Sequence, residues 1–396
     1  MIPSIYGYQG SVSPTSAHWD WVPALNGPAA PNPFTVWLFS SEVPPYFLGG
    51  LGRHVDRLAR YLVSRGHQVH VATPYQSDYP LPYHAWSLDD VEKSHPPNPV
   101  GTTVIHVHDP RLWDRARQLS LRWGCPLVIT WHTLYRAYAH YLSRPPDAQL
   151  AALERMVLAT GDRHIWVSQF LLRQAQVFYG HLPDAARNTI IGNGVSFPSI
   201  DVSQSPKGFP DLLYFGRLEE EKGIDWLLVA LSDLISRNPQ FQAILCGTGT
   251  MQEEIRSLIQ LQGWTHNVHA PGMVGDETLA RYIQTAQVAV LPSRFEPFGL
   301  TALEAMASGM ATVLGPAKGY QEFAEPYSNC LQVSTANELS MAVQSLCNDP
   351  AFGRQLGHEA SRLSENWNWL SVGRKIEREY EWLLRRTREM TGEDTL

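Results

Sequence analysis

Strand-like apolar runs alternate with helix-like amphipathic segments along most of this chain. The run FTVWLFSSE is followed by the glycine-rich stretch VPPYFLGGLG, by a helical pattern that stops at Gly66, and by a second run, HQVHVATP. A strand, a loop, a helix and another strand in this order form a unit whose two strands lie parallel in one sheet. The alternation therefore predicts parallel sheets with helices on both faces, which is an α/β fold of doubly wound domains.

A second set of alternating segments follows a stretch that is typical of a linker. The stretch FPSIDVSQSPKGFP is rich in Pro, Ser and Gly and has no periodicity. The later strand-like runs include DLLYFGRL, FQAILCGTG and VAVLPS. We expect an N-terminal arm at 1–34, Rossmann-like domains at 35–200 and 201–370, and a C-terminal amphipathic helix at 371–396 that returns to the first domain.

Composition narrows the class of protein. A length of 396 residues with 44% hydrophobic residues suits two packed cores. A net charge of −7 leaves no general basic field, so we expect no nucleic acid partner. The four cysteines lack CxxC spacing, which indicates free thiols in a reducing compartment. No segment reaches the roughly 18 apolar residues of a membrane-spanning helix, so we expect a cytoplasmic protein that is at most peripheral to a membrane.

Two glutamates in the segment RFEPFGLTALEAMASG lie on either side of a predicted helix start. Glu296 follows the strand-like run VAVLPS, and Glu304 lies inside the helical pattern. Ligands of open parallel sheets bind at the carboxyl ends of the strands, where helix N-termini present amides and a positive dipole end. The amides of Phe298, Gly299 and Leu300 can therefore form an anion pocket beside the first glutamate. Taken alone, the second is better explained as a solvated helix carboxylate.

Two cations are expected near the same pocket. Arg217 directly follows an apolar run, and Lys222 lies at the start of the next helical segment. Both can converge on an anion, and a diphosphate would satisfy them. The alternative is a surface ion pair with a neighbouring glutamate, which is plausible for the lysine and less so for the arginine. Gly247, in the sequence CGTG, adds a glycine turn after another strand of this domain.

The glycines of GGLG can serve an anion in the first domain. Gly49, Gly50 and Gly52 permit backbone shapes that bring amides towards an anion. The pattern is neither G-x-G-x-x-G nor a P-loop, so it indicates neither a dinucleotide-binding domain nor an NTPase. Taken alone, a tight turn required by packing explains it better.

Two histidine-containing motifs need separate interpretations. In HVHD, from His106 to Asp109, we expect the two histidines to face opposite ways along a regular strand and to lack further ligands, so we assign them a structural role and expect no metal site. His132 differs because it lies where a strand passes into a loop, followed by the polar residues Tyr135 and Arg136. A capped or core histidine is the alternative.

Together these motifs resemble those of the retaining nucleotide-sugar glycosyltransferases of the GT4 family, which have the two-domain GT-B fold. The resemblance begins near residue 35 and covers nearly all of the remaining chain. It rests on GGLGRHV, HVHD, TWHT, IGNGV, FGRLEEEKG and EPFGLTALE. The last of these fits the family's E-x7-E pattern at Glu296 and Glu304.

The resemblance implies roles for the candidate site residues of the second domain. Arg217 and Lys222 would hold the donor diphosphate together with the amides at 298–300. Glu304 would bind the ribose hydroxyls and Glu296 would contact the donor sugar. The backbone at Met273 and Val274 would meet the nucleobase.

The resemblance also implies roles in the first domain. Gly50, with Gly49 beside it, would approach the diphosphate, and His132 would lie by the sugar near the reacting carbon. No metal or other cofactor would be required, because cations of the chain would stabilise the charge on the leaving diphosphate. Closure of the two domains would exclude water. The candidates for the acceptor site are His54, Tyr135, Arg136 and Arg144, by position only.

We expect transfer of a hexose, with glucose favoured, from a UDP-, ADP- or GDP-sugar to a small-molecule or glycan hydroxyl. The chain is also similar to glycogen and starch synthases, but Phe47 and Leu48 stand where those enzymes have a lysine before the glycine pair. A sugar phosphate acceptor, as in sucrose-phosphate synthase, is equally open. The other hypotheses are a non-catalytic sugar-nucleotide-binding protein and a phosphosugar epimerase or phosphorylase.

Overall fold

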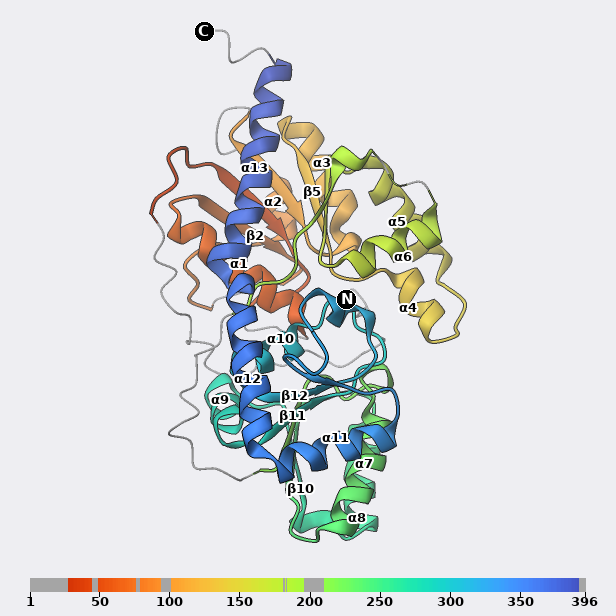
Figure 1. The fold of residues 1–396 in the computed structure, drawn as a ribbon. Helices are drawn as coiled ribbons and strands as arrows, with labels where there is room; N and C mark the ends of the chain where they lie inside the picture. The colour runs from red at the N-terminus through yellow and green to blue at the C-terminus, as the bar shows by residue number, and fades with distance from the viewer. Residues whose placement is uncertain are drawn as a thin grey trace. The chain divides into compact units, whose positions relative to one another are not determined.

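A computed structural model describes residues 28–44, 49–75, 79–93, 101–180, 182, 184–195 and 210–391 (Figure 1). Residues from Pro23 to Gly194 belong to an N-terminal unit that also contains the chain from Trp367 onward, and Val195–Asn366 belongs to a C-terminal unit. The predicted domain limits lie at 200 and 370. The predicted arm up to residue 27 and the predicted linker at 197–210, apart from Pro210, lie outside the described residues.

The N-terminal unit is built on a seven-stranded parallel sheet in the order β3-β2-β1-β4-β5-β6-β7. Its strands are β1 (Thr35–Phe39), β2 (Gln68–Thr73), β3 (His84–Ser87), β4 (Thr103–Val107), β5 (Leu127–Trp131), β6 (Arg163–Trp166) and β7 (Asn188–Ile190). Every residue of β1, β4 and β5 is buried. Such apolar central strands need helices on both faces of the sheet.

The helices of this unit are α1 (Gly50–Ser64), α2 (Leu88–Lys93), α3 (Trp113–Trp123), α4 (Tyr135–Tyr141), α5 (Ala148–Thr160), α6 (Gln169–Tyr179) and α13 (Trp369–Thr391), with short 3-10 turns at η1 (Pro110–Leu112) and η2 (Ala185–Arg187). Alternate residues of β1 face opposite sides of the sheet. Val36 and Leu38 share a core with α1 and α13. On the other side, the ring centroid of Trp37 lies 5.4 Å from that of Trp123 in α3.

The C-terminal unit contains a six-stranded parallel sheet in the order β10-β9-β8-β11-β12-β13. Its strands are β8 (Leu212–Phe215), β9 (Ala243–Cys246), β10 (Val268–Gly272), β11 (Val288–Leu291), β12 (Ala311–Leu314) and β13 (Leu331–Gln332). The helices are α7 (Ile224–Arg237), α8 (Gln252–Leu261), α9 (Asp276–Thr285), α10 (Leu300–Ala307), α11 (Ala336–Asn348) and α12 (Pro350–Ser364), with 3-10 turns at η3 (Glu220–Lys222), η4 (Trp264–His266), η5 (Lys318–Glu322) and η6 (Glu365–Trp367). Both units are doubly wound α/β domains, which confirms the predicted fold class.

Two predictions about the chain as a whole can be compared with this fold. The four cysteines form no disulfide, as predicted. Among the described residues, no helix is both long enough and apolar enough to cross a bilayer.

Helix α13 lies beside α1 in the N-terminal unit (Figure 1). Its buried face contains Val372, Ile376 and Tyr380, each 0% exposed, and this is the face that the helical periodicity predicts. Glu377 lies on the same helix with a fully buried side chain. Burying a carboxylate is costly unless charged and polar groups surround it.

Glu377 is surrounded in this way by groups from α1 and the turn behind it. Its carboxylate accepts a hydrogen bond from Tyr61 Oη at 2.6 Å and lies 3.1 Å from His67 Nε2 and 3.3 Å from Arg65 Nη2. Arg374 Nη1 lies 3.0 Å away on the same helix. Burial would raise the pKa of Glu377, but the hydrogen bonds of His67, Tyr61 and Arg374 outweigh it and lower this pKa to about 2.

Replacing Glu377 by Ala should lower the free energy of unfolding by about 3 kcal/mol at pH 7, because it leaves buried cationic partners without their carboxylate. Urea unfolding measures the change. Glu381→Ala is the control, because this glutamate lies on the same helix with a side chain that is 39% exposed. The folded pKa lies below the ordinary 4.5. The stabilisation should therefore be complete above pH 4.5 and lost as the pH falls towards 2. Equal small losses in the two variants would contradict this account.

Candidate active site

The strand order of the C-terminal sheet reverses between β8 and β11, and most predicted donor residues lie where its strands end. Arg217 follows β8, Gly247 follows β9, Met273 follows β10 and Glu296 follows β11. The carboxyl ends of parallel strands share one edge of a sheet, and a reversal of strand order is where ligands bind in such sheets. The sequence prediction of one shared edge is therefore met by the topology.

Glycines allow the loops of this edge to approach each other closely. Gly223 has φ +73°, and a Cβ there would lie 2.2 Å from Pro292 O. Gly299 has φ +105°, and a Cβ there would lie 2.5 Å from the ring of Tyr320. A residue with a Cβ would be strained at these positive φ values and would clash with the neighbouring loop. Helix α10 begins directly after Gly299, so its N-terminus lies at this edge.

Three close ion pairs among the described residues line the edge. They are Arg217–Glu221, Lys222–Glu296 and Arg294–Asp225, with nitrogen to oxygen distances of 2.9, 2.5 and 2.9 Å. The side chains of Lys222 and Glu296 are 15% and 18% exposed, so a ligand can reach both. Each cation is balanced by a carboxylate, which keeps the charges of the edge compensated.

The alternative of an ion pair with a neighbouring glutamate holds for the cation for which the sequence made it less plausible. A neighbouring glutamate was the more plausible partner for Lys222, yet it is Arg217 that pairs with Glu221, while the lysine pairs with Glu296. Glu221 is 3% exposed and lies in η3, where the turn directs it back to the arginine four residues earlier. The loop after β11 also contacts this turn, because the amides of Arg294 and Phe295 donate to Glu221 O.

Glu304 lies in α10 and is 8% exposed, so its explanation as a solvated helix carboxylate is wrong.

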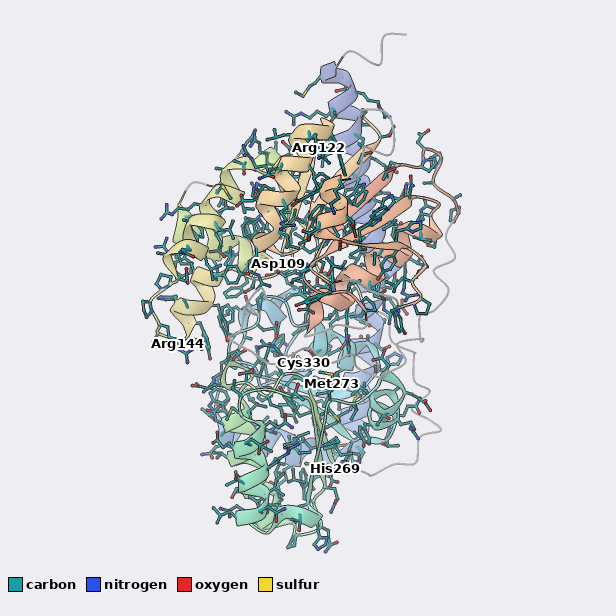
Figure 2. All side chains as sticks on the ribbon, turned by 180° about the vertical axis from the view of Figure 1, so that it is seen from behind. Asp109, Arg122, Arg144, His269, Met273 and Cys330 are labelled. Carbon is teal, nitrogen blue, oxygen red and sulfur yellow. The ribbon has the colours of Figure 1, made fainter. Side chains whose placement is uncertain are left out.

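The nucleobase candidates lie in the loop between β10 and α9, where Met273 is 46% exposed and Val274 is partly buried (Figure 2). The amide of Gly247 donates to Gly272 O at 2.8 Å, so this glycine turn ties β9 to β10.

In the N-terminal unit, three histidines from different elements converge. His54 lies in α1, His108 follows β4 and His132 follows β5. His108 Nδ1 lies 3.2 Å from His132 Nε2. One ring nitrogen from each of the three lies within 4.8 Å of the others. We call these residues the histidine cluster.

The predictions for HVHD were wrong in two respects. The rings of His106 and His108 do not face opposite ways but have centroids 4.1 Å apart, because residues two positions apart on a strand point to the same face. The expectation that no further ligands accompany them also fails, since His54 and His132 lie beside His108. His106 does have a structural role, because it bonds Tyr380 Oη at 2.5 Å and Thr130 Oγ1 at 2.8 Å.

Burial keeps the histidine cluster neutral. It lowers the pKa of His54 to about 4, an effect that the Asn193 side chain partly opposes. Burial, and then repulsion from neighbouring imidazoles, lowers the pKa of His108 and His132 well below the ordinary value. A neutral imidazole offers one donor and one acceptor, so it can bond a sugar hydroxyl or bind a metal. His132 is only partly buried, which leaves it reachable.

The glycine loop already binds a carboxylate of this chain, that of Glu42, which the sequence motifs did not identify. The amides of Gly49 and Gly52 donate to Glu42 Oε2 at 3.1 and 3.2 Å. Gly50, the first residue of α1, is exposed. The signal that could have identified Glu42 is its place just after β1, ahead of the glycines, where a helix N-terminus attracts a carboxylate.

The acceptor candidates divide into buried and exposed residues. His54 is 2% exposed and belongs to the histidine cluster, and Tyr135 is 7% exposed. Arg136 is partly buried and donates from Nη1 to Phe178 O at 2.9 Å. Arg144 is exposed and lies at the outer side of the α4 region, away from Asp109 at the strand ends (Figure 2).

A buried glutamate positions the helix that follows His132. Glu154 is 0% exposed, and its carboxylate accepts from the amide of Tyr135 at 2.6 Å and from the amide of Arg136 at 3.4 Å. Tyr179 Oη also donates to it. These bonds hold the first turn of α4, which fixes the loop after β5.

Two family models match the chain. Glycosyltransferase Family 4 matches residues 79–197, which include two members of the histidine cluster. Glycosyl transferases group 1 matches residues 197–366, which include all three ion pairs. The chain belongs to the family 4 glycosyltransferases.

Curated relatives resemble this glycosyltransferase over most of its length. It is 27% identical to the glycogen synthase of Mycobacterium tuberculosis H37Rv over 383 residues, which cover 85% of this chain and 92% of that protein. Among solved structures, sucrose-phosphate synthase from Thermosynechococcus elongatus has a TM-score of 0.75 and 23% identity, and covers 89% of this chain and 100% of that chain. HepE of Anabaena, solved with UDP-glucose, has a TM-score of 0.70 and 17% identity, and covers 88% of this chain and 100% of that chain. These likenesses show the GT-B fold.

Glu154→Gln should change how stability depends on pH. Burial raises the pKa of Glu154 from 4.5 to about 7. The wild type should therefore lose stability relative to the variant as the pH rises from 4.5 through 7, by about 3 kcal/mol in total. Urea unfolding at pH 5 and pH 8 measures this difference. Glu92→Gln, at a glutamate that is 47% exposed, should show no such change. A difference between wild type and Glu154→Gln that is independent of pH would contradict the assignment.

Proposed function

We propose that this glycosyltransferase moves a hexose from a nucleoside-diphosphate sugar to a hydroxyl group, with retention of anomeric configuration and without a metal ion. The observation that carries the proposal is the Lys222–Glu296 pair beside the start of α10. A carboxylate and an ammonium that are held together, partly exposed and next to a helix N-terminus suit a ligand with sugar hydroxyls at one point and a phosphate at the next.

The charges of this edge support a role for it in bond cleavage. When the bond between the anomeric carbon and the diphosphate breaks, negative charge grows on the diphosphate and positive charge grows on the sugar ring. Arg217, Lys222 and the amides at the start of α10 would stabilise the negative charge on the diphosphate. Glu296 would remain beside the sugar. In front-face attack, the acceptor oxygen bonds the anomeric carbon while its proton passes to the leaving diphosphate oxygen.

The other predicted residues take supporting roles in this proposal. Glu304 would bind the ribose and the backbone at Met273 and Val274 the base. In the N-terminal unit, Gly50 would approach the diphosphate, and His132, which is neutral, would bond a sugar hydroxyl. Tyr135, Arg136, Arg144 and His54 remain candidates for acceptor binding.

UDP-glucose is the donor that we propose, since the solved HepE structure holds UDP-glucose. The similarity to a glycogen synthase favours α-glucan elongation as a second candidate. Incubation with labelled UDP-glucose and either glycogen or hexose phosphates separates the two by product size. A reducing compartment such as the cytoplasm suits the unpaired cysteines.

Lys222→Ala and Glu296→Ala should each lower transfer at least about 100-fold, because each removes a preorganised charged group from the transition state. Release of UDP from UDP-glucose, with and without acceptor, measures the effect. Glu220→Ala is the control, because this neighbouring side chain is 72% exposed, and it should stay within about twofold of wild type. Circular dichroism checks the fold. Turnover close to wild type in both of the first two variants would overturn the mechanism.

A further inference from the structure

The histidine cluster contains more polar groups than the proposed reaction uses. That reaction places His132 at the donor sugar and gives His108 no role, yet His54 and His108 are 2% and 1% exposed beside it. Within the described part of the chain, both ring nitrogens of His54 and Nε2 of His108 have no hydrogen-bond partner. Buried polar atoms that lack a partner are rare, so the free ring nitrogens of His54 beside two other imidazoles point to a ligand.

The spacing of the nitrogens is close to that of a metal site. In a tetrahedral site with metal to nitrogen bonds of about 2.0–2.1 Å, ligand nitrogens lie roughly 3.3 Å apart. His108 Nδ1 and His132 Nε2 are already 3.2 Å apart. His54 completes a set whose ligand atoms all lie within 4.8 Å of one another. Its ring would have to move closer to the other two for all three nitrogens to bind one ion.

Groups behind the cluster suit the orientation of metal ligands. Asn193 neighbours His54, is 7% exposed and has an Oδ1 without a partner in the described residues. This oxygen can accept the N–H of one His54 nitrogen and thereby leave the other nitrogen for a metal, which is the usual arrangement behind a metal-bound imidazole. His106, which Tyr380 and Thr130 hold, packs against the ring of His108.

We propose that His54, His108 and His132 bind one divalent transition-metal ion of borderline softness, with Zn²⁺ the best fit. Three neutral imidazoles with an open fourth position suit Zn²⁺. They do not suit Mg²⁺ or Ca²⁺, which require oxygen ligands. A second part rests on the proposed function: the ion takes His132 away from the donor sugar and so inhibits transfer.

Binding is tested on the full chain after treatment with a chelator. Titration with Co²⁺ should give the visible absorption of tetrahedral Co²⁺, and this absorption should saturate at one ion per chain. Added Zn²⁺ should displace the Co²⁺ and abolish the absorption. His54→Ala and His108→Ala should each weaken binding at least 100-fold, and Asn193→Ala about tenfold. His358→Ala, at a histidine that is 79% exposed, should bind as wild type does.

X-ray absorption of the Zn²⁺-loaded wild type tests the ligands even if the variants fail to fold. Scattering from imidazole rings supports the site, and its absence overturns the proposal. The proposal is also overturned if His358→Ala lowers affinity as much as the cluster variants do, or if the wild type binds no ion at one per chain.

The inhibitory part is tested by UDP release from UDP-glucose with increasing Zn²⁺. Half-inhibition should fall at the Zn²⁺ concentration of half-saturation, and it should shift about tenfold in Asn193→Ala, in parallel with binding. Stoichiometric binding without inhibition overturns this part and contradicts the role of His132 at the sugar. Metal-free transfer with no Zn²⁺ binding overturns the metal site while leaving the proposed function intact.

Discussion

Parallel strand pairing is the constraint on which the arrangement of this glycosyltransferase depends. Every strand pair that the structure describes within the two sheets is parallel, so each connection must cross back over a face of its sheet. All strands of a sheet then end at one edge. Residues far apart in sequence, such as Lys222 and Glu296, meet there without a dedicated scaffold. The histidine cluster arises in the same way after β4 and β5.

Charge compensation explains how this edge can hold cations before any donor arrives. Arg217, Lys222 and Arg294 each have a carboxylate partner, so none is a buried uncompensated charge. The pair Lys222–Glu296 is partly exposed. In the proposed reaction the diphosphate would replace the carboxylate as partner of the lysine, and the glutamate would turn to the sugar. An exchange of partners costs less than desolvating an isolated cation would.

The sequence predicted those features that depend on local pattern. Alternating segments gave the doubly wound units, and strand-end motifs gave the edge with Arg217 and Glu296. The failures concern pairings that only tertiary packing decides. The partner of Arg217 depends on the turn of η3, and the convergence of His54 with His108 depends on how α1 packs on the sheet. Glu42 went unrecognised because its partners are backbone amides, so only its place between β1 and the glycines could have indicated the contact.

The most direct test of the donor site is a thermal-shift comparison of UDP, ADP, GDP and their glucose conjugates with EDTA present. Wild type, Arg217→Ala and the control Arg256→Ala, at an arginine that is 54% exposed, are compared. The proposed donor site predicts a metal-independent rise in melting temperature with one nucleotide and its conjugate, which is lost in Arg217→Ala and kept in Arg256→Ala. Absence of any rise in wild type, or an equal rise in Arg217→Ala, would contradict it.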